Sequence, residues 1–158
     1  MRQIAKTLLA AVILALPVAA RAASERVVYF DSKIKVSKQN VLDITETVRY
    51  DFGDANHHGI YRNIPIDYSD SDGKKYFINF KFLDAPLDSA NVETSLPDSG
   101  GNEQLKLGDP STTIGGQHTY IIHYQLTPVI NQKDGRDHLA LDVVGNGWDV
   151  PIDKATSI

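Results

Sequence analysis

The chain has 158 residues, no cysteine, and 16 Lys and Arg against 20 Asp and Glu, which gives a formal net charge of −4. A chain without cysteine has no disulfide framework, no thiol nucleophile and no cysteine-ligated zinc site, so its fold must depend on an apolar core. An acidic surface repels the phosphates of nucleic acids and of anionic lipids, which argues against both as partners.

The first two dozen residues predict a helical signal peptide. Two basic residues are followed by an unbroken apolar run over residues 8–20 and by small residues that end at Ala22. The run is shorter than the roughly 20 residues that a membrane-spanning helix requires, so we expect cleavage after Ala22 rather than an uncleaved anchor. Residues 1–22 hold three of the 16 basic residues and no acidic one. The single domain expected over 23–158 therefore has 13 against 20 and a net charge of −7.

The beginning of this domain alternates between apolar and polar residues. The period of two over residues 28–36 and 42–52, with a turn at 37–40 between them, predicts an antiparallel hairpin with one apolar face. The residues expected on that face are Val28, Phe30, Ile34, Val36, Leu42, Ile44, Val48, Tyr50 and Phe52.

Shorter strands are expected through the rest of the chain. Residues 60–68 are expected to be extended, because Pro65 disfavours a helix and has no N–H to donate. Asp72 and Gly73 predict a hairpin turn, since this dipeptide tolerates the positive φ that such turns require. Further strands are expected over residues 76–82, 91–96, 104–107, 119–126 and 139–143, and an interrupted one over 154–158.

Many short strands separated by turns are typical of an all-β domain, and no segment after the leader has a helical period. Most strands are apolar on one face only, which favours two packed sheets. We therefore predict an antiparallel β-sandwich of about seven to nine strands, preceded by the helical signal peptide. Trp148 lies between Gly147 and Pro151 and is expected to close the core.

One acidic residue breaks the apolar face of the second strand. Glu46 shares its face with Ile44 and Val48, so it is expected to be buried with them. An unpaired carboxylate there would cost several kcal/mol and therefore needs a cation. Arg62, within the apolar stretch 59–65, is the expected partner, because a guanidinium can meet a carboxylate through two parallel hydrogen bonds. We interpret the pair as structural, and a catalytic role for Glu46 is the alternative.

Several segments together resemble the YciQ-like family of predicted bacterial membrane proteins. The most specific is residues 58–65, His-Gly-Ile-Tyr-Arg-Asn-Ile-Pro. The other segments that carry the resemblance are residues 41–46, 50–52, 116–124 and 145–152, the last one centred on Trp148. The resemblance covers most of the chain after the leader.

The resemblance implies a signal peptide, an extracytoplasmic β-rich domain, and then membrane helices with a cytoplasmic tail. It implies no catalytic residues. No membrane segment follows Ile158 in this sequence, so we expect either a piece of a longer anchored protein or a member that is free in the periplasm. In both cases the domain is exported to the extracytoplasmic side of a bacterial membrane, and the lack of cysteine fits a bacterial envelope protein.

Two patterns suggest metal ligands, and both are weak. His57 and His58 are adjacent, which is a poor geometry for chelating one ion. Asp67, Asp70 and Asp72 form only part of a calcium loop, because the remaining ligand positions are Tyr68 and Asn79. We therefore expect no metal and no other cofactor, with weak calcium binding by the three aspartates as the alternative.

These observations favour a non-enzymatic binding or sensing domain whose partner is an unknown envelope protein or a glycan. Loops on rigid sheets commonly carry recognition, so the candidate interaction loop is His57, His58, Gly59, Tyr61 and Arg62. One alternative is a glycan-binding module that uses the faces of Tyr61, Tyr68, Tyr76 and Trp148. Another is a secreted hydrolase that uses Glu46 with Asp43 or Asp51, although both aspartates should point away from Glu46 on a regular strand.

Overall fold

The computed structural model describes residues 24–69, 73, 75–85, 92–94, 101–133, 135–145 and 147–158, and the expected signal peptide lies outside these ranges. Within them the chain forms twelve strands. They are β1 (Arg26–Val36), β2 (Leu42–Asp51), β3 (Gly59–Pro65), β4 (Asp67–Ser69), β5 (Lys75–Phe77), β6 (Asn79–Asp84), β7 (Val92–Thr94), β8 (Asn102–Gly108), β9 (Gln117–Thr127), β10 (Ile130–Lys133), β11 (Arg136–Leu139) and β12 (Ala155–Ser157). In this part of the chain, no helix is long and apolar enough to cross a bilayer.

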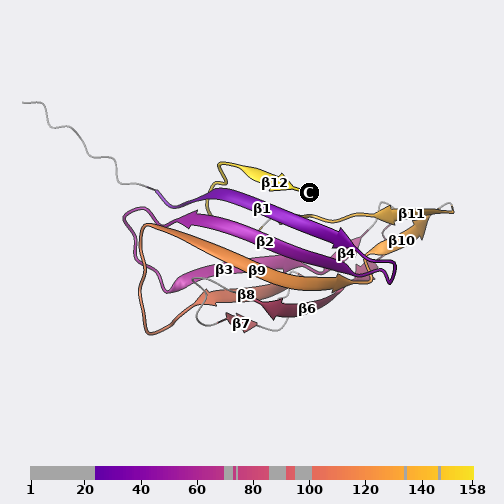
Figure 1. The fold of residues 1–158 in the computed structure, drawn as a ribbon, viewed down its shortest axis with the longest axis horizontal. Helices are drawn as coiled ribbons and strands as arrows, with labels where there is room; N and C mark the ends of the chain where they lie inside the picture. Colours follow the sequence, from indigo (N-terminus) through magenta and orange to yellow (C-terminus); the bar gives the residue numbers. More distant parts are fainter. Residues whose placement is uncertain are drawn as a thin grey trace, which may run out of the picture.

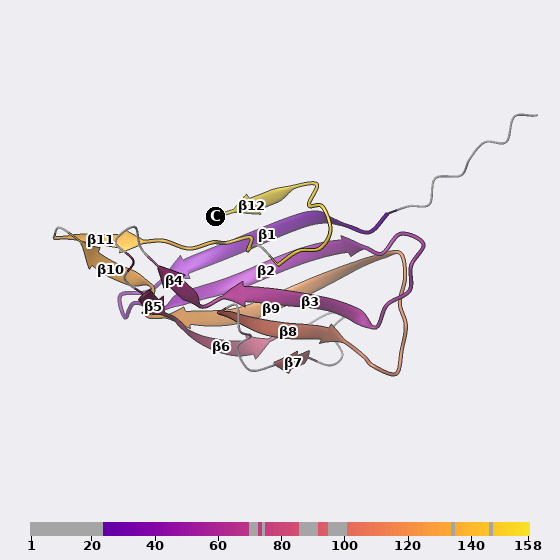
Figure 2. The ribbon, with the colours of Figure 1, turned by 180° about the vertical axis from the view of Figure 1, so that it is seen from behind.

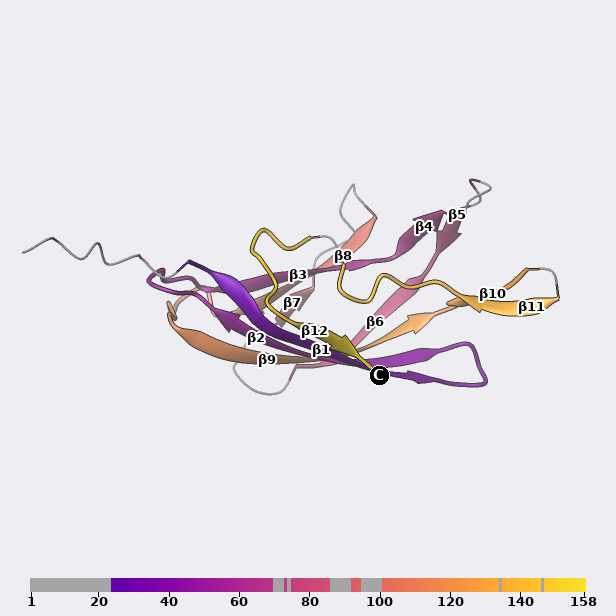
Figure 3. The same ribbon diagram turned by 90° about the horizontal axis from the view of Figure 1, so that it is seen from above.

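The strands form two layers, which confirms the predicted all-β sandwich-like fold. One layer is a five-stranded sheet in the order β12-β1-β2-β9-β6, and the other is a three-stranded sheet in the order β3-β8-β7 (Figure 1). Figures 2 and 3 show β3 and β8 packed over β2 and β9. The hairpins β4–β5 and β10–β11 extend from the same end of the molecule (Figure 3).

The core lies between the two layers. The apolar face of β2 is buried as its alternation predicts, and it packs with inward residues of β3, β8 and β9. Each fully buried aliphatic or aromatic side chain contributes about 1.5–3 kcal/mol to folding. The fully buried apolar residues include Phe30, Leu42, Ile44, Val48, Leu105, Leu107, Tyr120, Ile122 and Leu126.

A β-bulge changes which residues of β1 face the core. The register with β2 shifts between Val27 and Tyr29, so the extra residue places Val27 and Phe30 inward, both with no exposed surface. Val28 was expected inward and is only half-buried, and Val36 at the far end is exposed. The sequence-based assignment was wrong at Val28, because alternation assumes an uninterrupted ladder. Val36 keeps the alternation of Phe30 and Ile34, but it is exposed as the last residue of the strand.

The structure has more strands than the seven to nine expected. The strand expected over 76–82 is divided into β5 and β6 at Ile78, whose N–H donates to the Ile66 carbonyl (2.8 Å), one residue beyond the β4–β5 pairing. Residues 130–133 and 136–139 form the hairpin β10–β11, whereas the strand expected in this region began only at residue 139. The β4–β5 hairpin is present with Gly73 at φ +77°, whereas Asp70 and Asp72 of the calcium hypothesis lie outside the described residues.

The C-terminal segment closes the open side of the sandwich. Of the strand expected over 139–143, only Leu139 belongs to a strand, β11. The chain after it forms no strand until β12, and it packs against the core through Leu141, Val143 and Trp148. It ends as β12, which pairs in parallel with β1. That pairing is an exception to the antiparallel arrangement expected throughout.

Candidate binding site

The structure places Glu46 of β2 and Arg62 of β3 in contact across the two sheets. Arg62 donates from Nε and Nη2 to the two carboxylate oxygens of Glu46, at 2.8 and 2.7 Å. Glu46 has no exposed surface, and 1% of Arg62 is exposed. The pair therefore has the two parallel hydrogen bonds expected from the sequence, in a fully desolvated setting.

The surroundings of the pair satisfy most of its remaining hydrogen-bonding capacity. Tyr124 donates its hydroxyl to Glu46 Oε1 (2.7 Å), and the guanidinium also donates to the carbonyls of Asn63 and Val143. Burial alone would lower the pKa of Arg62, but the charge and hydrogen bonds of Glu46 outweigh this effect and raise the pKa. Arg62 stays charged, and Glu46 neutralises it within the core.

Aromatic rings enclose the guanidinium from two sides. Its central carbon lies 5.5 Å from the ring centroids of both Phe30 and Trp148. Trp148 also meets Phe30 edge-to-face and donates Nε1–H to the Val144 carbonyl (3.0 Å). Gly145 (φ +75°) passes so close to Arg62 that a Cβ would come within 2.8 Å of Nη1. Trp148 therefore closes the core over Arg62, the position expected for it from its neighbours.

This burial removes Arg62 from the candidate interaction loop. The first two residues of the remaining loop are held: His57 stacks on Phe52 at 5.4 Å, and His58 Nδ1 lies 3.0 Å from the Thr112 carbonyl. Gly59 faces the backbone of β8 so closely that a Cβ would lie 2.0 Å from the Leu107 carbonyl oxygen. Of the five residues, His57, His58 and Tyr61 are exposed, and Tyr61, at 56%, is the large hydrophobic side chain among them.

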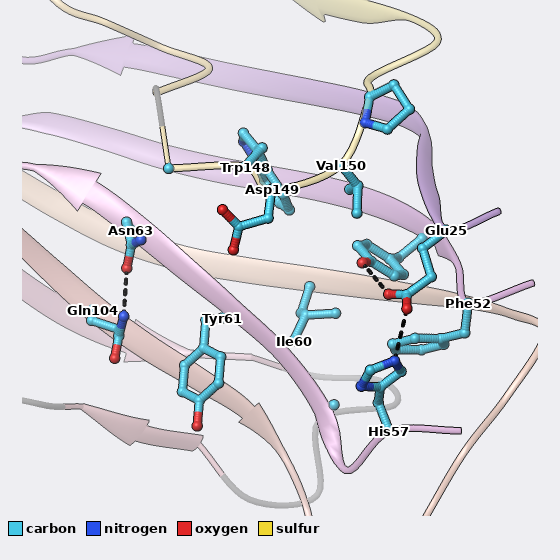
Figure 4. Close-up of a pocket in the computed structure, with 14 residues that line it drawn as sticks. Glu25, Phe52, His57, Ile60, Tyr61, Asn63, Gln104, Trp148, Asp149 and Val150 are labelled. Atoms are coloured by element: carbon cyan, nitrogen blue, oxygen red, sulfur yellow. Dashed lines mark hydrogen bonds and ion pairs between the residues drawn. The ribbon is translucent and has the colours of Figure 1, made fainter. Parts of the chain in front are cut away.

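An open pocket of about 650 Å³ lies beside this loop. Its walls come from four parts of the chain: Glu25 before β1, the end of β2, residues 57–63, and residues 147–151 (Figure 4). Gln104 of β8 completes it and donates to the Asn63 side chain (2.9 Å). Tyr61 thus lies on the rim of a cavity that neither Glu46 nor Arg62 lines.

A chain of hydrogen bonds orders one end of the pocket. Glu25 accepts from the Tyr50 hydroxyl through Oε2 and lies against His57 Nε2 through Oε1, both at 2.8 Å (Figure 4). Burial raises the pKa of Tyr50, and the charges of Glu25 and Asp149 raise it further. Tyr50 therefore remains a protonated donor, and Glu25 acts as the charged acceptor between two rings.

Among the described lining residues of the pocket, acidic side chains outnumber basic ones. Glu25 and Asp149 supply carboxylates, His57 is the only basic side chain among its described lining residues, and no Lys or Arg is among them. The carboxylate of Asp149 is directed from the C-terminal segment toward β3, at a distance from the Glu25 end (Figure 4). The pocket can therefore receive a cationic or hydrogen-bond-donating group.

Sequence reasoning missed most of these pocket residues. Glu25 lies three residues after the end of the expected signal peptide, and Asp149 is an exposed residue near a proline, so neither breaks a pattern. Only the fold brings them near Tyr50. The exposed His57 was selected as part of a loop, whereas its partner Glu25 is 32 positions away in the chain.

Asp51, at the end of β2, accepts hydrogen bonds from residues close to the Glu25 end of the pocket. It accepts from Gly53 N–H (3.0 Å), Gln117 (3.3 Å) and Arg26 (3.0 Å). These bonds, the one from Gly53 first, lower the pKa of Asp51 against the opposing effect of burial. A depressed pKa in the folded state contributes stability above the unfolded pKa, and this stability is lost as the pH falls through the folded pKa.

Asp51→Asn is therefore expected to lower the free energy of unfolding at pH 7 by about 1 kcal/mol. The difference from the unsubstituted chain should shrink below about pH 4, where the native carboxylate also becomes protonated. Urea unfolding between pH 2.5 and 7 checks this expectation. A difference that is constant over that range would contradict the role of the charge.

A further group of titratable side chains lies outside the pocket. His123 lies on the outer face of the large sheet, with Nε2 at 3.0 Å from Asp43 and Nδ1 at 3.6 Å from Asp84. Hydrogen bonds from Gln125 and His123 lower the pKa of Asp43. Among the described residues, no group of three or more His, Cys, Asp or Glu side chains is arranged to hold a metal ion.

Comparison with known proteins identifies the family of this chain. Residues 26–157 match the family described as "Predicted membrane protein (DUF2207) N-terminal domain". The chain belongs to this family. The match covers nearly all of residues 23–158, including the segment 58–65 on which the resemblance to YciQ-like proteins mainly rested.

A curated relative agrees with this assignment. The uncharacterized protein YciQ of Escherichia coli (strain K12) is 26% identical over 132 residues, which is 82% of this chain. The aligned part is 21% of the length of YciQ, so this chain spans about a fifth of that relative.

Two larger solved structures have some likeness in fold. Leukotriene A4 hydrolase from Saccharomyces cerevisiae has 10% identity and a TM-score of 0.46, over 64% of this chain and 15% of that chain. A two-domain M1 zinc metallopeptidase mutant bound to L-tryptophan has 10% identity and a TM-score of 0.43, over 70% and 22% respectively. Likeness at this level says nothing about the chemistry of this domain.

Proposed function

We propose that this domain is a non-enzymatic binding or sensing module on the extracytoplasmic side of the bacterial envelope. The observation that carries the proposal is the open pocket beside Tyr61, ordered by the Glu25–Tyr50–His57 hydrogen bonds. A concave site with aromatic walls and a few convergent polar groups is the usual form of a ligand site. Its partner is an envelope protein or a glycan.

The environment of Glu46 supports a binding role over catalysis. A general acid or nucleophile must reach its substrate, and Glu46 has no exposed surface. Arg62 and Tyr124 engage its two oxygens. Asp43 and Asp51, the second carboxylates of the hydrolase alternative, lie on the opposite face of β2, where they have partners of their own.

Two features support the cellular setting. The leader pattern of residues 1–22 favours export. Membership of a family of predicted membrane proteins, together with the greater length of YciQ, supports membrane association through segments outside this chain. In this arrangement the domain would present its pocket to the extracytoplasmic space.

Glycan binding is the second candidate, and one observation favours it. Tyr61 exposes a ring beside the Asn63–Gln104 amide pair, a combination that can stack on a sugar and hydrogen-bond its hydroxyls. The wider aromatic platform is not available, because Trp148 and Tyr68 pack against the core. A glycan would therefore have to bind through Tyr61 and the pocket.

The proposal predicts that partner capture depends on the exposed side chains of the loop beside the pocket. A His58→Ala/Tyr61→Ala variant should recover at least about tenfold less partner than the unsubstituted chain, since exposed aromatic anchors dominate binding surfaces. The measurement is cross-linking to solubilised bacterial envelope, followed by quantification of each captured species. His58 and Tyr61 are chosen because their removal leaves the Glu25–Tyr50–His57 bonds in place.

The matched control is His138→Ala/Phe77→Ala, which removes an exposed histidine and an exposed aromatic ring elsewhere. It should capture the partner as well as the unsubstituted chain does. Equal capture by all three proteins would defeat the choice of surface. Turnover of an envelope substrate that is lost in Glu46→Gln, at unchanged stability, would defeat the non-enzymatic reading.

A further inference from the structure

The pocket beside Tyr61 has the composition of a cation site. Its described lining residues include two acids, Glu25 and Asp149, four aromatic rings, and no Lys or Arg. An anionic ligand would meet two carboxylates, and the one basic side chain among the described lining residues, His57, already contacts Glu25. An organic cation would meet both charge and π-faces, which attract it together.

Glu25 retains the capacity to accept a further hydrogen bond. An ionised carboxylate offers about four acceptor positions. Tyr50 and His57 use one position on each oxygen. The two rings therefore hold the carboxylate in one orientation and leave acceptor positions for a ligand that donates N–H groups.

Asp149 adds a second carboxylate within electrostatic reach of the same place. Its charge, like that of Glu25, raises the pKa of Tyr50. Its side chain is exposed, and none of the hydrogen bonds or ion pairs drawn among the pocket residues involves it (Figure 4). A cation close to Tyr50 would thus be attracted by both acids.

The aromatic walls favour an ammonium on an alkyl chain over a bare metal ion. Tyr61 and Trp148 present ring surface to the pocket. Tyr50 and Phe52, with ring centroids 4.6 Å apart, line its end with only 7% and 1% of their surface exposed. Such walls bury methylene groups and face an ammonium with their π-electrons. The two carboxylates also lie apart in the pocket, whereas the ligands of a metal ion converge on one point (Figure 4).

We propose that this pocket binds an aliphatic primary ammonium group, carried by a small free amine or by the lysine side chain of a peptide. This inference rests on the proposed function, because it names the ligand class of the same surface. Glu25 receives the ammonium, Tyr50 and His57 orient Glu25, and Asp149 adds attraction from the opposite wall. The net negative charge of the domain favours the approach of such a ligand.

The sequence contains one tryptophan, Trp148, and it lines the pocket, so its fluorescence reports on occupancy directly. We expect a saturable change when the exported chain is titrated with cadaverine or with Nα-acetyl-lysine methylamide. The Nε-acetylated form of the second probe lacks the positive charge and should give no change. Comparison of the two amines distinguishes a free amine from a lysine side chain as the better ligand.

Glu25→Gln and Asp149→Asn should each weaken amine binding by about tenfold, the loss of one charge-assisted hydrogen bond or ion pair. Asp84→Asn is the matched control, because it removes an exposed carboxylate on β6 outside the pocket. It should leave the affinity unchanged. Thermal unfolding of each variant verifies that the fold is kept.

Three results would overturn the inference: no saturable response to either amine, equal binding of the acetylated probe, or equal weakening by Asp84→Asn. Failure of the inference can be distinguished from failure of the proposed function. If the amines do not bind and the His58→Ala/Tyr61→Ala variant still loses its envelope partner, the ligand class is wrong and the binding role stands.

Discussion

Replacing Glu46 by leucine is expected to lower the free energy of unfolding by about 3–5 kcal/mol. The substitution leaves the Arg62 guanidinium buried, with the carbonyls of Asn63 and Val143 as the acceptors that remain. It also removes the acceptor of the Tyr124 hydroxyl inside the core. Urea unfolding followed by the fluorescence of Trp148 measures the change, because this ring lies against Arg62.

A double variant separates the cost of an unpaired charge from the loss of packing. Glu46→Leu/Arg62→Met removes both charges and should recover much of the lost stability, since apolar pairs of similar size often replace buried ion pairs without loss. Asp153→Asn is the control for an exposed pair: its partner is Arg26, its side chain is 51% exposed, and less than about 1 kcal/mol should be lost. Equal destabilisation of the single and double Glu46 variants would show that the charge is not the cause.

The contact behind this prediction could be derived from two simple rules. The alternation of Ile44, Glu46 and Val48 places a carboxylate in the core, and a buried carboxylate requires a cation. Arg62 is flanked by Ile60 and Ile64, both buried in the structure, so the same alternation directs it inward. Each rule depends only on local sequence, and the two strands meet because both faces must be buried.

Other parts of the fold depend on backbone geometry that side-chain patterns do not encode. The bulge at Val28 inserts one residue and reverses the faces of β1 before it. Residues 139–143 alternate like a strand, but nearby backbone carbonyls are used by side chains. Arg62 donates a hydrogen bond to the Val143 carbonyl and Trp148 donates one to the Val144 carbonyl, so this segment contacts the core without pairing with another strand. In the second case, tertiary contacts outweigh the local preference for a strand.

The pocket was the least predictable part for a related reason. Its residues come from positions 25, 50–63, 104 and 147–151, which no motif connects. A loop can be selected from sequence as an exposed feature on a rigid sheet, and Tyr61 was found in this way. The acid that completes it, Glu25, has no sequence signal, because its importance arises only from contacts with Tyr50 and His57.

Trp148→Ala is expected to lower the free energy of unfolding by about 3 kcal/mol, as large-to-small substitutions of aromatic residues in cores do. Three contacts are lost together: the edge-to-face contact with Phe30 at 6.3 Å, the ring over Arg62 at 5.5 Å, and the hydrogen bond to Val144. The variant has no tryptophan, so urea unfolding is followed by far-UV circular dichroism.

Two further variants show what the ring itself contributes. Trp148→Phe keeps an aromatic face over Arg62 but lacks the Nε1–H donor to Val144, so it should lose less than the alanine variant. Phe77→Ala removes a ring that is 70% exposed and should change stability by less than about 0.5 kcal/mol. If Trp148→Ala were no more destabilising than Phe77→Ala, the indole would be a surface group. The segment 147–151 would then not be held over Arg62, and the pocket would lack the wall that this segment supplies.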